Sequence, residues 1–400
     1  MEFMLYTRQF KSNSGCCKMK KDEYIKIIIK YKKIYLPQIK KIKQKFIWTM
    51  NNYDKNSLIN IMVEHRNLIK NLILDVINEF EEFRKIKCCI MLNGSLARGT
   101  NTFYSDIDIN YFYSNDYFEK MINVEEEVNY ILQTIMGYRG KDRIHSMVVY
   151  LPLIRKNDYE SIKDNKYPIY FDDGVIYNKC RENAEELMYQ TFNSTRSIYD
   201  LCDYLNLNDN TSSIKEWANC FELVYDNGLY EEFIKNRKVC KDTDNLSNLI
   251  HNIMESINRD NYFIDDKTAQ IKIKELKNTY KMQVLHNVYE LLALYFRLNK
   301  KFKNINIFNY EKENIGIKKE FYETFYKYMN LIQKLQFILD DNDMDFSFHS
   351  TKVVTNKFLN QEYKKTFNYN NIIFDLNNEK KKLYKICKDI LIEEMIKYEK

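Results

Sequence analysis

The sequence predicts an α+β protein, in which a mixed sheet with helices against it is followed by an all-α helical-bundle domain. Two apolar runs with strand character, at 88–92 and 107–113, alternate with segments of helical periodicity. From residue 183 onward strand signals nearly vanish, and apolar residues recur at the three- and four-residue spacing of helices. The 400 residues therefore divide into an N-terminal helical segment (1–54), an α+β domain (55–180) and a helical accessory domain (181–400).

The elements of the α+β domain follow from periodicity. Apolar residues at helical spacing predict an amphipathic helix from Leu58 to Phe83, directly before the first strand. After the strand from Ile107 to Tyr113, the same spacing predicts a helix from Tyr117 to Met136. His145–Ile154 and Tyr167–Tyr177 are strand candidates, the second interrupted by a turn. The predicted order is α, β, α or turn, β, α, β, β.

The segments on either side are predicted to be helical. Residues 20–50 alternate lysines with Ile, Tyr and Phe, and Pro37 interrupts them, which predicts two short helices. The segment 281–299 carries so few charges that we expect it to be the central helix of the C-terminal bundle. The helices of that bundle are expected at 183–205, 213–236, 244–258, 267–299, 318–340 and 377–398.

The composition narrows the class of protein. The 62 basic and 56 acidic side chains are interspersed and leave a net charge of +6, which is weak evidence for a nucleic-acid partner. The nine cysteines form no CxxC pair and no Cys/His cluster at zinc-ligand spacing, so we expect them to be reduced and mostly buried. No stretch has the apolar length that a bilayer requires. The sequence therefore predicts a cytoplasmic protein without a membrane partner.

The turn after the first predicted strand has the composition of a phosphate-binding turn. Only eight glycines occur in the chain, and Gly94 and Gly99 lie within six positions, which indicates that backbone geometry requires them. A Gly-Ser turn lets backbone N–H groups and the Ser95 hydroxyl approach a phosphate, and a helix beginning near Leu96 would direct its N-terminus at the same anion. Arg98 can add a charge-assisted contact. We therefore predict that Gly94, Ser95 and Arg98 bind a nucleotide.

Two aspartates open the second predicted strand, with one isoleucine between them. Successive side chains of a strand point to opposite faces, so Asp106 and Asp108 are expected on one face, about 7 Å apart. Carboxylates at this separation can share divalent metal ions, which neutralise a triphosphate so that its α-phosphorus can be attacked. We therefore predict Asp106 and Asp108 as catalytic residues and as ligands of Mg²⁺, with Mn²⁺ as the alternative ion.

The string GSLARGTNTFYSDIDI joins these two features, with ten residues between Ser95 and Asp106. It resembles the signature of the DNA polymerase beta-type nucleotidyltransferase superfamily. With Arg98, Gly99 and Ser105 before the aspartates, it is most similar to the branch of the nitrogen-regulatory protein uridylyltransferases and the glutamine synthetase adenylyltransferases. The resemblance covers residues 88–113 and fades beyond them. It implies a nucleotidyltransferase fold for 55–180, with the glycine and serine on the nucleotide phosphates and both aspartates on Mg²⁺.

The resemblance also implies an activity. This activity is the Mg²⁺-dependent transfer of a nucleoside monophosphate from a nucleoside triphosphate, expected to be ATP, to an acceptor hydroxyl with release of pyrophosphate. A protein or a small molecule is the expected acceptor, and nucleic acid is allowed but not favoured. Two alternatives stay open: a catalytically inactive nucleotide-binding or antitoxin-like interaction module, and an RNA nucleotidyltransferase.

One departure from the superfamily concerns a third carboxylate, which many members place on a later strand as a general base or metal ligand. The expected strand at 145–154 has no acidic residue. Asp172 or Asp173 in the next segment can substitute, although Asp-Asp-Gly is equally a turn signal. His145, at the start of the strand, is expected to be structural, because no orienting partner is evident from the sequence.

Overall fold

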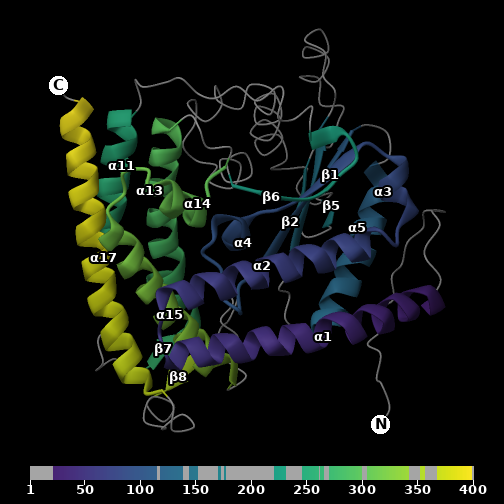
Figure 1. The fold of residues 1–400 in the computed structure, drawn as a ribbon, viewed down its shortest axis with the longest axis horizontal. Helices are drawn as coiled ribbons and strands as arrows, with labels where there is room; N and C mark the ends of the chain where they lie inside the picture. Colours follow the sequence, from purple (N-terminus) through teal and green to yellow (C-terminus); the bar gives the residue numbers. More distant parts are fainter. Residues whose placement is uncertain are drawn as a thin grey trace.

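The described part of the protein contains a mixed six-stranded sheet and a large set of helices (Figure 1). The computed structural model describes residues 21–114, 118–137, 144–151, 170–172, 175–176, 220–230, 246–260, 262–264, 270–299, 304–341, 352–355 and 367–398. The helices are α1 Lys21–Asn51, α2 Lys55–Ile77, α3 Glu81–Lys85, α4 Gly94–Arg98, α5 Phe118–Met136, α11 Leu246–Arg259, α12 Ile273–Lys277, α13 Gln283–Leu298, α14 Ile307–Glu313, α15 Lys319–Asp341 and α17 Tyr369–Tyr398. The strands are β1 Cys88–Leu92, β2 Ile107–Ser114, β3 Ile144–Leu151, β4 Tyr170–Asp172, β5 Val175–Ile176, β6 Glu222–Asp226, β7 Gln270–Lys272 and β8 Val353–Thr355.

The sheet has the strand order β5-β4-β3-β2-β1-β6. β2 and β3 are parallel, because α5 carries the chain back to the end of the sheet at which β2 begins. The other neighbouring strands are antiparallel. β1 is an inner strand whose residues are all buried, which explains its unbroken apolar run. The predicted order of elements is confirmed by α2, β1, α4, β2, α5, β3, β4 and β5, and so is the α+β class.

A strand in the C-terminal half corrects the expectation of an all-α domain from residue 181. We expected a helix at 213–236, but Glu222–Asp226 forms β6, which pairs antiparallel with β1. The pattern of so short an apolar segment is compatible with helix and strand. The free edge of β1 decides between them, because it supplies hydrogen-bond partners to a strand. β7 and β8 form a second, two-stranded sheet in this half, so the predicted helix at 267–299 begins only at Ile273.

α1 is one continuous helix, where two short helices were expected on either side of Pro37. Pro37 lies on the exposed face, and so does Lys33, whose carbonyl loses the N–H that proline lacks. Water can satisfy that carbonyl. On the opposite face Tyr35 and Ile42 are buried, before and after the proline. A break at Pro37 would uncover this buried face, so tertiary packing keeps the helix continuous.

Helices α1, α2 and α5 form two layers on one face of the sheet (Figure 1). α2 contacts β6, α5 contacts β3, and the two helices contact each other, so they cover the same face. α1 packs across both of them and also reaches α15. The predicted helix from Leu58 to Phe83 is in fact two helices, because α2 ends at Ile77 and α3 begins at Glu81.

The C-terminal helices gather at one end of the molecule (Figure 1). α17 contacts α11, α13 and α15, and α11 also contacts α13. In α13 the side chains of Val284, Val288, Leu291 and Leu292 are fully buried, although they lie on more than one side of the helix. This confirms the expectation that 281–299 contributes a central helix.

The described cysteines agree with the expectation drawn from the composition. Cys88, Cys89, Cys220 and Cys387 are buried and form no disulfide, and the other five lie outside the described residues. Burial raises the pKa of the Cys88 thiol to about 12, so it stays protonated at neutral pH. None of the helices among the described residues combines the length and the apolar character that crossing a membrane requires.

Candidate functional site

The Gly-Ser turn follows β1 directly. Gly94 begins α4, which has five residues, and Gly99 caps its C-terminus. Both glycines have a positive φ, +61° and +76°, a conformation that residues with a side chain disfavour. The prediction that backbone geometry demands these two glycines is therefore confirmed. The helix begins at Gly94, where we expected a start near residue 96. It is little more than one turn long, so we assign no role to a helix dipole.

The turn lies directly against the second aspartate. A Cβ atom on Gly94 would be 1.8 Å from Oδ2 of Asp108 and 2.8 Å from its Cγ, well inside van der Waals contact. The two residues are fourteen positions apart, and antiparallel pairing of β1 with β2 brings them together by placing Leu92 opposite Ile109. The absence of a side chain on Gly94 therefore leaves room for the Asp108 carboxylate at the base of the turn.

Asn93 connects this turn to both neighbouring strands. Its backbone N–H donates to the carbonyl of Asp108 at 2.9 Å. Its side-chain oxygen accepts from Nδ2 of Asn110 at 2.8 Å, and its Nδ2 donates to the carbonyl of Cys220 at 2.8 Å. Asn93 and Asn110 are buried, so losing either partner would leave polar groups unsatisfied. Sequence reasoning missed both asparagines, since cross-strand partners become evident only from the strand register.

Asp106 lies at the entry to β2 rather than within it, because the strand begins at Ile107. Its carboxylate is partly exposed, with 34% of the side chain accessible. Nζ of Lys277, the last residue of α12, lies 3.7 Å from Oδ2 of Asp106, and the lysine side chain is buried. The structure thus adds a cation that sequence reasoning missed. No spacing or motif connects position 277 with position 106.

The helical part of the protein holds the loop between α4 and β2 in place. Oγ1 of Thr102 donates to Oε1 of Gln336 at 2.6 Å, and the backbone N–H of Phe103 donates to Oε1 of Gln333 at 2.8 Å. Both glutamines belong to α15 and are buried. Hydrogen bonds to buried groups are costly to break, so α15 fixes the segment that leads into Asp106.

The other end of α4 is held in the same way. Nδ2 of Asn306, the N-cap of α14, donates to the carbonyl of Ala97 at 2.8 Å. A Cβ atom on Gly99 would be 2.7 Å from the ring of Phe308, so this glycine allows α14 to approach the turn. The turn and the helical part therefore form a single packed unit.

Ser95 and Arg98, the other predicted phosphate ligands, both belong to α4. Ser95 is 8% exposed, and its carbonyl accepts from the backbone N–H of Thr100 at 3.0 Å. The guanidinium of Arg98 lies 5.4 Å from the ring centre of Tyr289 on α13. Burial raises the pKa of the Cys220 thiol to about 12; Arg98 opposes this rise and Asp108 adds to it. Arg98 and Asp108 are therefore both close enough to Cys220 to act on it electrostatically.

The strand register bears on the candidate third acid. In the pairing of β2 with β3, His145 lies next to Asp108, whereas in the pairing of β3 with β4 Asp172 lies next to Met147. Asp173 is outside the described residues. Among the residues that the structure describes, no three His, Cys, Asp or Glu side chains form a group that can hold a metal ion. The structure brings Asp108 against Gly94 and Asp106 near Lys277, and among the described residues no third acidic side chain joins the two aspartates.

The two aspartates fit the Mg²⁺ that the resemblance implies. Carboxylate oxygens are hard ligands of the kind that Mg²⁺ binds in nucleotide sites, where phosphates and waters supply the other positions. Oδ2 of Asp108 lies at the base of the Gly-Ser turn, in the space that a side chain at position 94 would fill, and the side chains of Asp106 and Asp108 are both partly exposed. A pair of protein carboxylates is thus a sufficient donor set when a triphosphate completes it.

His65 packs against the loop between α4 and β2 and makes the free energy of unfolding depend on pH. Its ring stacks on Phe103, with 5.5 Å between ring centres, and its Nδ1 lies 3.5 Å from Nδ2 of Asn101. Burial lowers the pKa of His65 to about 4 from 6.5. Between these values the unfolded chain binds a proton that the folded chain does not, so stability rises with pH. We expect the free energy of unfolding to fall by about 2 kcal/mol from pH 6.5 to pH 5 on this account.

Denaturant titrations of the wild-type protein and of His65→Phe at pH 6.5, 5.5 and 5 measure this effect. Phenylalanine keeps the stacked ring and removes the titrating group, so the variant should lose about 2 kcal/mol of the pH dependence. His251→Gln, an exposed position on α11, is the matched control and should retain the wild-type slope. An unchanged slope in His65→Phe would contradict the assignment.

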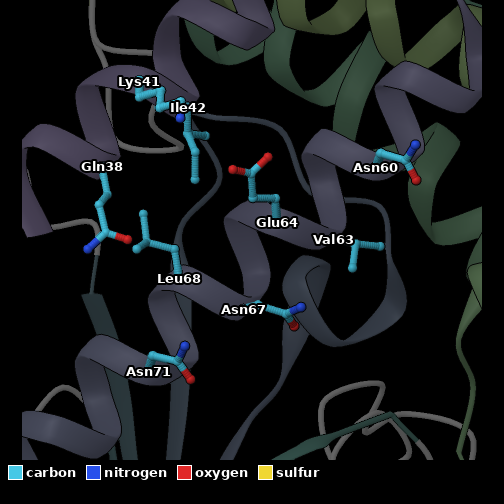
Figure 2. Close-up of a pocket in the computed structure, with 9 residues that line it drawn as sticks. All are labelled: Gln38, Lys41, Ile42, Asn60, Val63, Glu64, Asn67, Leu68 and Asn71. Atoms are coloured by element: carbon cyan, nitrogen blue, oxygen red, sulfur yellow. The ribbon is translucent and has the colours of Figure 1, made fainter.

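A cavity of about 440 Å³ lies between the two N-terminal helices, α1 and α2 (Figure 2). Its walls are partly polar and partly apolar, and Glu64, one of the lining residues, accepts a hydrogen bond from Lys45 at 2.5 Å. None of the predicted site residues lines it. The lining residues are Gln38, Lys41 and Ile42 of α1 and Asn60, Val63, Glu64, Asn67, Leu68 and Asn71 of α2.

No family model and no curated protein matches the chain.

Proposed function

We propose that the protein is a Mg²⁺-dependent nucleotidyltransferase that uses ATP or another nucleoside triphosphate. The observation that carries this proposal is the contact between Gly94 and Asp108, in which only the absence of a side chain leaves room for the carboxylate. A phosphate-binding turn and a metal-binding carboxylate are needed at one place for chemistry on a triphosphate. The resemblance of residues 88–113 to the nucleotidyltransferase superfamily supports the same reading.

The roles of the residues follow from their positions. Asp106 and Asp108 would hold Mg²⁺, which polarises the phosphoryl oxygens and neutralises charge on the triphosphate. Gly94 and Ser95 would bind the β- and γ-phosphates through the turn, and Arg98 on the same helix would offset phosphate charge. Lys277, whose Nζ is 3.7 Å from Oδ2 of Asp106, adds a second cation that is contributed by the helical part.

The proposed reaction is an in-line substitution. The oxygen of an acceptor hydroxyl attacks the α-phosphorus, the bond from the α-phosphorus to the oxygen bridging to the β-phosphate breaks, and pyrophosphate leaves while the hydroxyl proton passes to solvent. The protein accelerates this step by holding the triphosphate in position and by placing fixed charges where negative charge develops. A protein side chain or a small molecule is the proposed acceptor.

Transfer of label from each of the four nucleoside triphosphates to the components of a cell lysate tests the proposal. With α-³²P-labelled triphosphate and Mg²⁺, we expect an acceptor to become labelled and pyrophosphate to be released. With γ-³²P-labelled triphosphate, or with EDTA in place of Mg²⁺, we expect no labelled acceptor. Label from the γ-position would indicate phosphoryl transfer instead, and nucleotide binding by calorimetry without any transfer would indicate a binding module.

A further inference from the structure

A buried charged cluster around Lys380 lies in the helical part of the protein. Nζ of Lys380 on α17 donates to Oδ1 of Asp260 at 2.9 Å and to the carbonyl of Tyr262 at 3.2 Å, and the hydroxyl of Tyr384 donates to Oδ2 of Asp260. Lys380 is fully buried, and Asp260 and Tyr384 are 5% and 4% exposed. A buried ion pair carries a desolvation cost that apolar residues avoid, so it adds little to the stability of the protein. We therefore ask which groups the pair holds in position.

The third hydrogen bond of Lys380 leads to a π-helical turn. Residues Asn278–Met282 form this turn between α12 and α13, with the N–H of Gln283 bonded to the carbonyl of Asn278. Nζ of Lys380 donates to the carbonyl of Thr279 at 3.0 Å. The hydroxyl of Tyr328 on α15 donates to the next carbonyl, that of Tyr280, at 2.7 Å. Two successive carbonyls of the turn are thus held by side chains of two other helices.

The turn sets the direction of the residue that precedes it. Each residue of an α-helix turns the chain by about 100° about the helix axis, so the extra residue of a π-turn changes by roughly that angle the side of the axis on which Lys277 lies relative to α13. α13 is buried in the bundle, whereas α12 ends at Lys277, whose Nζ lies 3.7 Å from Asp106. π-turns are rare and occur frequently at functional sites. The orientation of Lys277 therefore depends on the geometry of this turn.

We propose that Lys380 and Tyr328 are positioning residues, which hold the π-turn so that Lys277 reaches the Asp106 carboxylate. Asp260 and Tyr384 in turn hold the Lys380 ammonium in the orientation that reaches the turn. This inference rests on the proposed function, since it assigns Lys277 to the triphosphate site. In addition to the residues on the sheet, the site then includes Lys277 of α12 and depends on Tyr328 of α15 and Lys380 of α17.

The variant Tyr328→Phe provides the cleanest test, because it deletes one hydroxyl and leaves no buried charge unpaired. Lys380→Met would leave the Asp260 carboxylate buried without its cation and is expected to unfold the bundle. The matched control is Tyr326→Phe on the same helix, whose buried hydroxyl has no hydrogen-bond partner in the part of the chain that the structure describes. The transfer rate is measured as kcat/KM for the triphosphate in Tyr328→Phe, Tyr326→Phe, Lys277→Met and the double variant of Lys277 and Tyr328.

We expect Lys277→Met to lower kcat/KM by about a hundredfold, as for the loss of one charge-stabilising donor. Tyr328→Phe should lower it by about fivefold through the loss of one hydrogen bond, and Tyr326→Phe should leave it unchanged. In the Lys277→Met background, Tyr328→Phe should have no further effect, because it acts through the lysine. If Tyr328 had a purely structural role, the double variant would lose kcat/KM by the product of the two single losses. That result would overturn the inference.

Amide hydrogen exchange separates a failure of this inference from a failure of the proposed function. Tyr328→Phe should accelerate exchange in residues 277–284 and leave α2 and α5 as in the wild-type protein, whether or not transfer is detected. Unchanged exchange in 277–284 would overturn the inference even if the wild-type protein transfers label. Faster exchange in a protein that transfers no label would support the anchoring of the turn and refute the transferase proposal alone.

Discussion

Asp108→Asn is expected to lower the rate of nucleotidyl transfer by about a thousandfold or more, equivalent to about 4 kcal/mol of transition-state stabilisation. The substitution keeps the volume of the side chain and removes the charge that would hold Mg²⁺ beside the Gly94 turn. Asp106→Asn should have an effect of the same order, and it also removes the charge partner of Lys277. Steady-state rates with an α-labelled triphosphate and a fixed acceptor measure both losses.

The control for this experiment is Asp226→Asn. Asp226 is exposed at the end of β6, and it pairs in register with Cys89 near the end of β1 remote from the Gly-Ser turn. Its side-chain oxygen accepts from the N–H of Tyr230, a role that asparagine can retain. Activity and melting temperature should therefore stay near the wild-type values. Near-wild-type turnover in the double variant of Asp106 and Asp108 would refute the proposed chemistry.

Gly94→Ala is expected to abolish transfer while the protein remains folded. The new methyl group would lie 1.8 Å from Oδ2 of Asp108, so the carboxylate must rotate away from the turn. Asp108 is partly exposed, so its carboxylate can turn toward solvent, and the positive φ of +61° adds about 1 to 2 kcal/mol of backbone strain. We therefore expect a modest loss in the free energy of unfolding together with a loss of activity comparable to that of Asp108→Asn.

Gly137→Ala separates these two effects. Gly137 follows α5 with a φ of +72°, and a Cβ atom there would meet no atom of the described residues within 4 Å. Alanine at this position should therefore reproduce the backbone strain, about 1 to 2 kcal/mol, without touching the aspartates. Denaturant unfolding should show similar losses for the two alanine variants, and only Gly94→Ala should lose transfer. Full activity of Gly94→Ala would mean that Asp108 does not act from the position seen here.

Local sequence patterns predicted the part of the candidate site that is formed at β1 and β2, which contains Gly94 and Asp108. The run Cys88–Leu92 could be identified as a buried strand, and the rarity of glycine pointed to Gly94 and Gly99. Antiparallel pairing of strands joined by a short connection then brings Gly94 and Asp108 together, as the structure shows. These inferences succeeded because strand periodicity and glycine backbone freedom are properties of the residues themselves.

Other features depended on neighbours that local patterns do not reveal. Pro37 would end an isolated helix, but the buried faces on both sides of it keep α1 continuous. Glu222–Asp226 became a strand because β1 had an edge to pair with. The buried asparagines and glutamines around the turn, such as Asn93 and Gln333, were not distinguishable from the many surface amides of this chain.

By itself, the sequence determined the α+β class, the order of the first elements, and a glycine turn followed by two aspartates. Only the tertiary structure decided that Lys277 lies beside Asp106 and that a π-turn held by Lys380 and Tyr328 directs it there. The reason is physical: strand periodicity and the backbone freedom of glycine are properties of neighbouring residues, whereas the contact between a helical lysine and a distant carboxylate depends on how the whole bundle packs against the sheet.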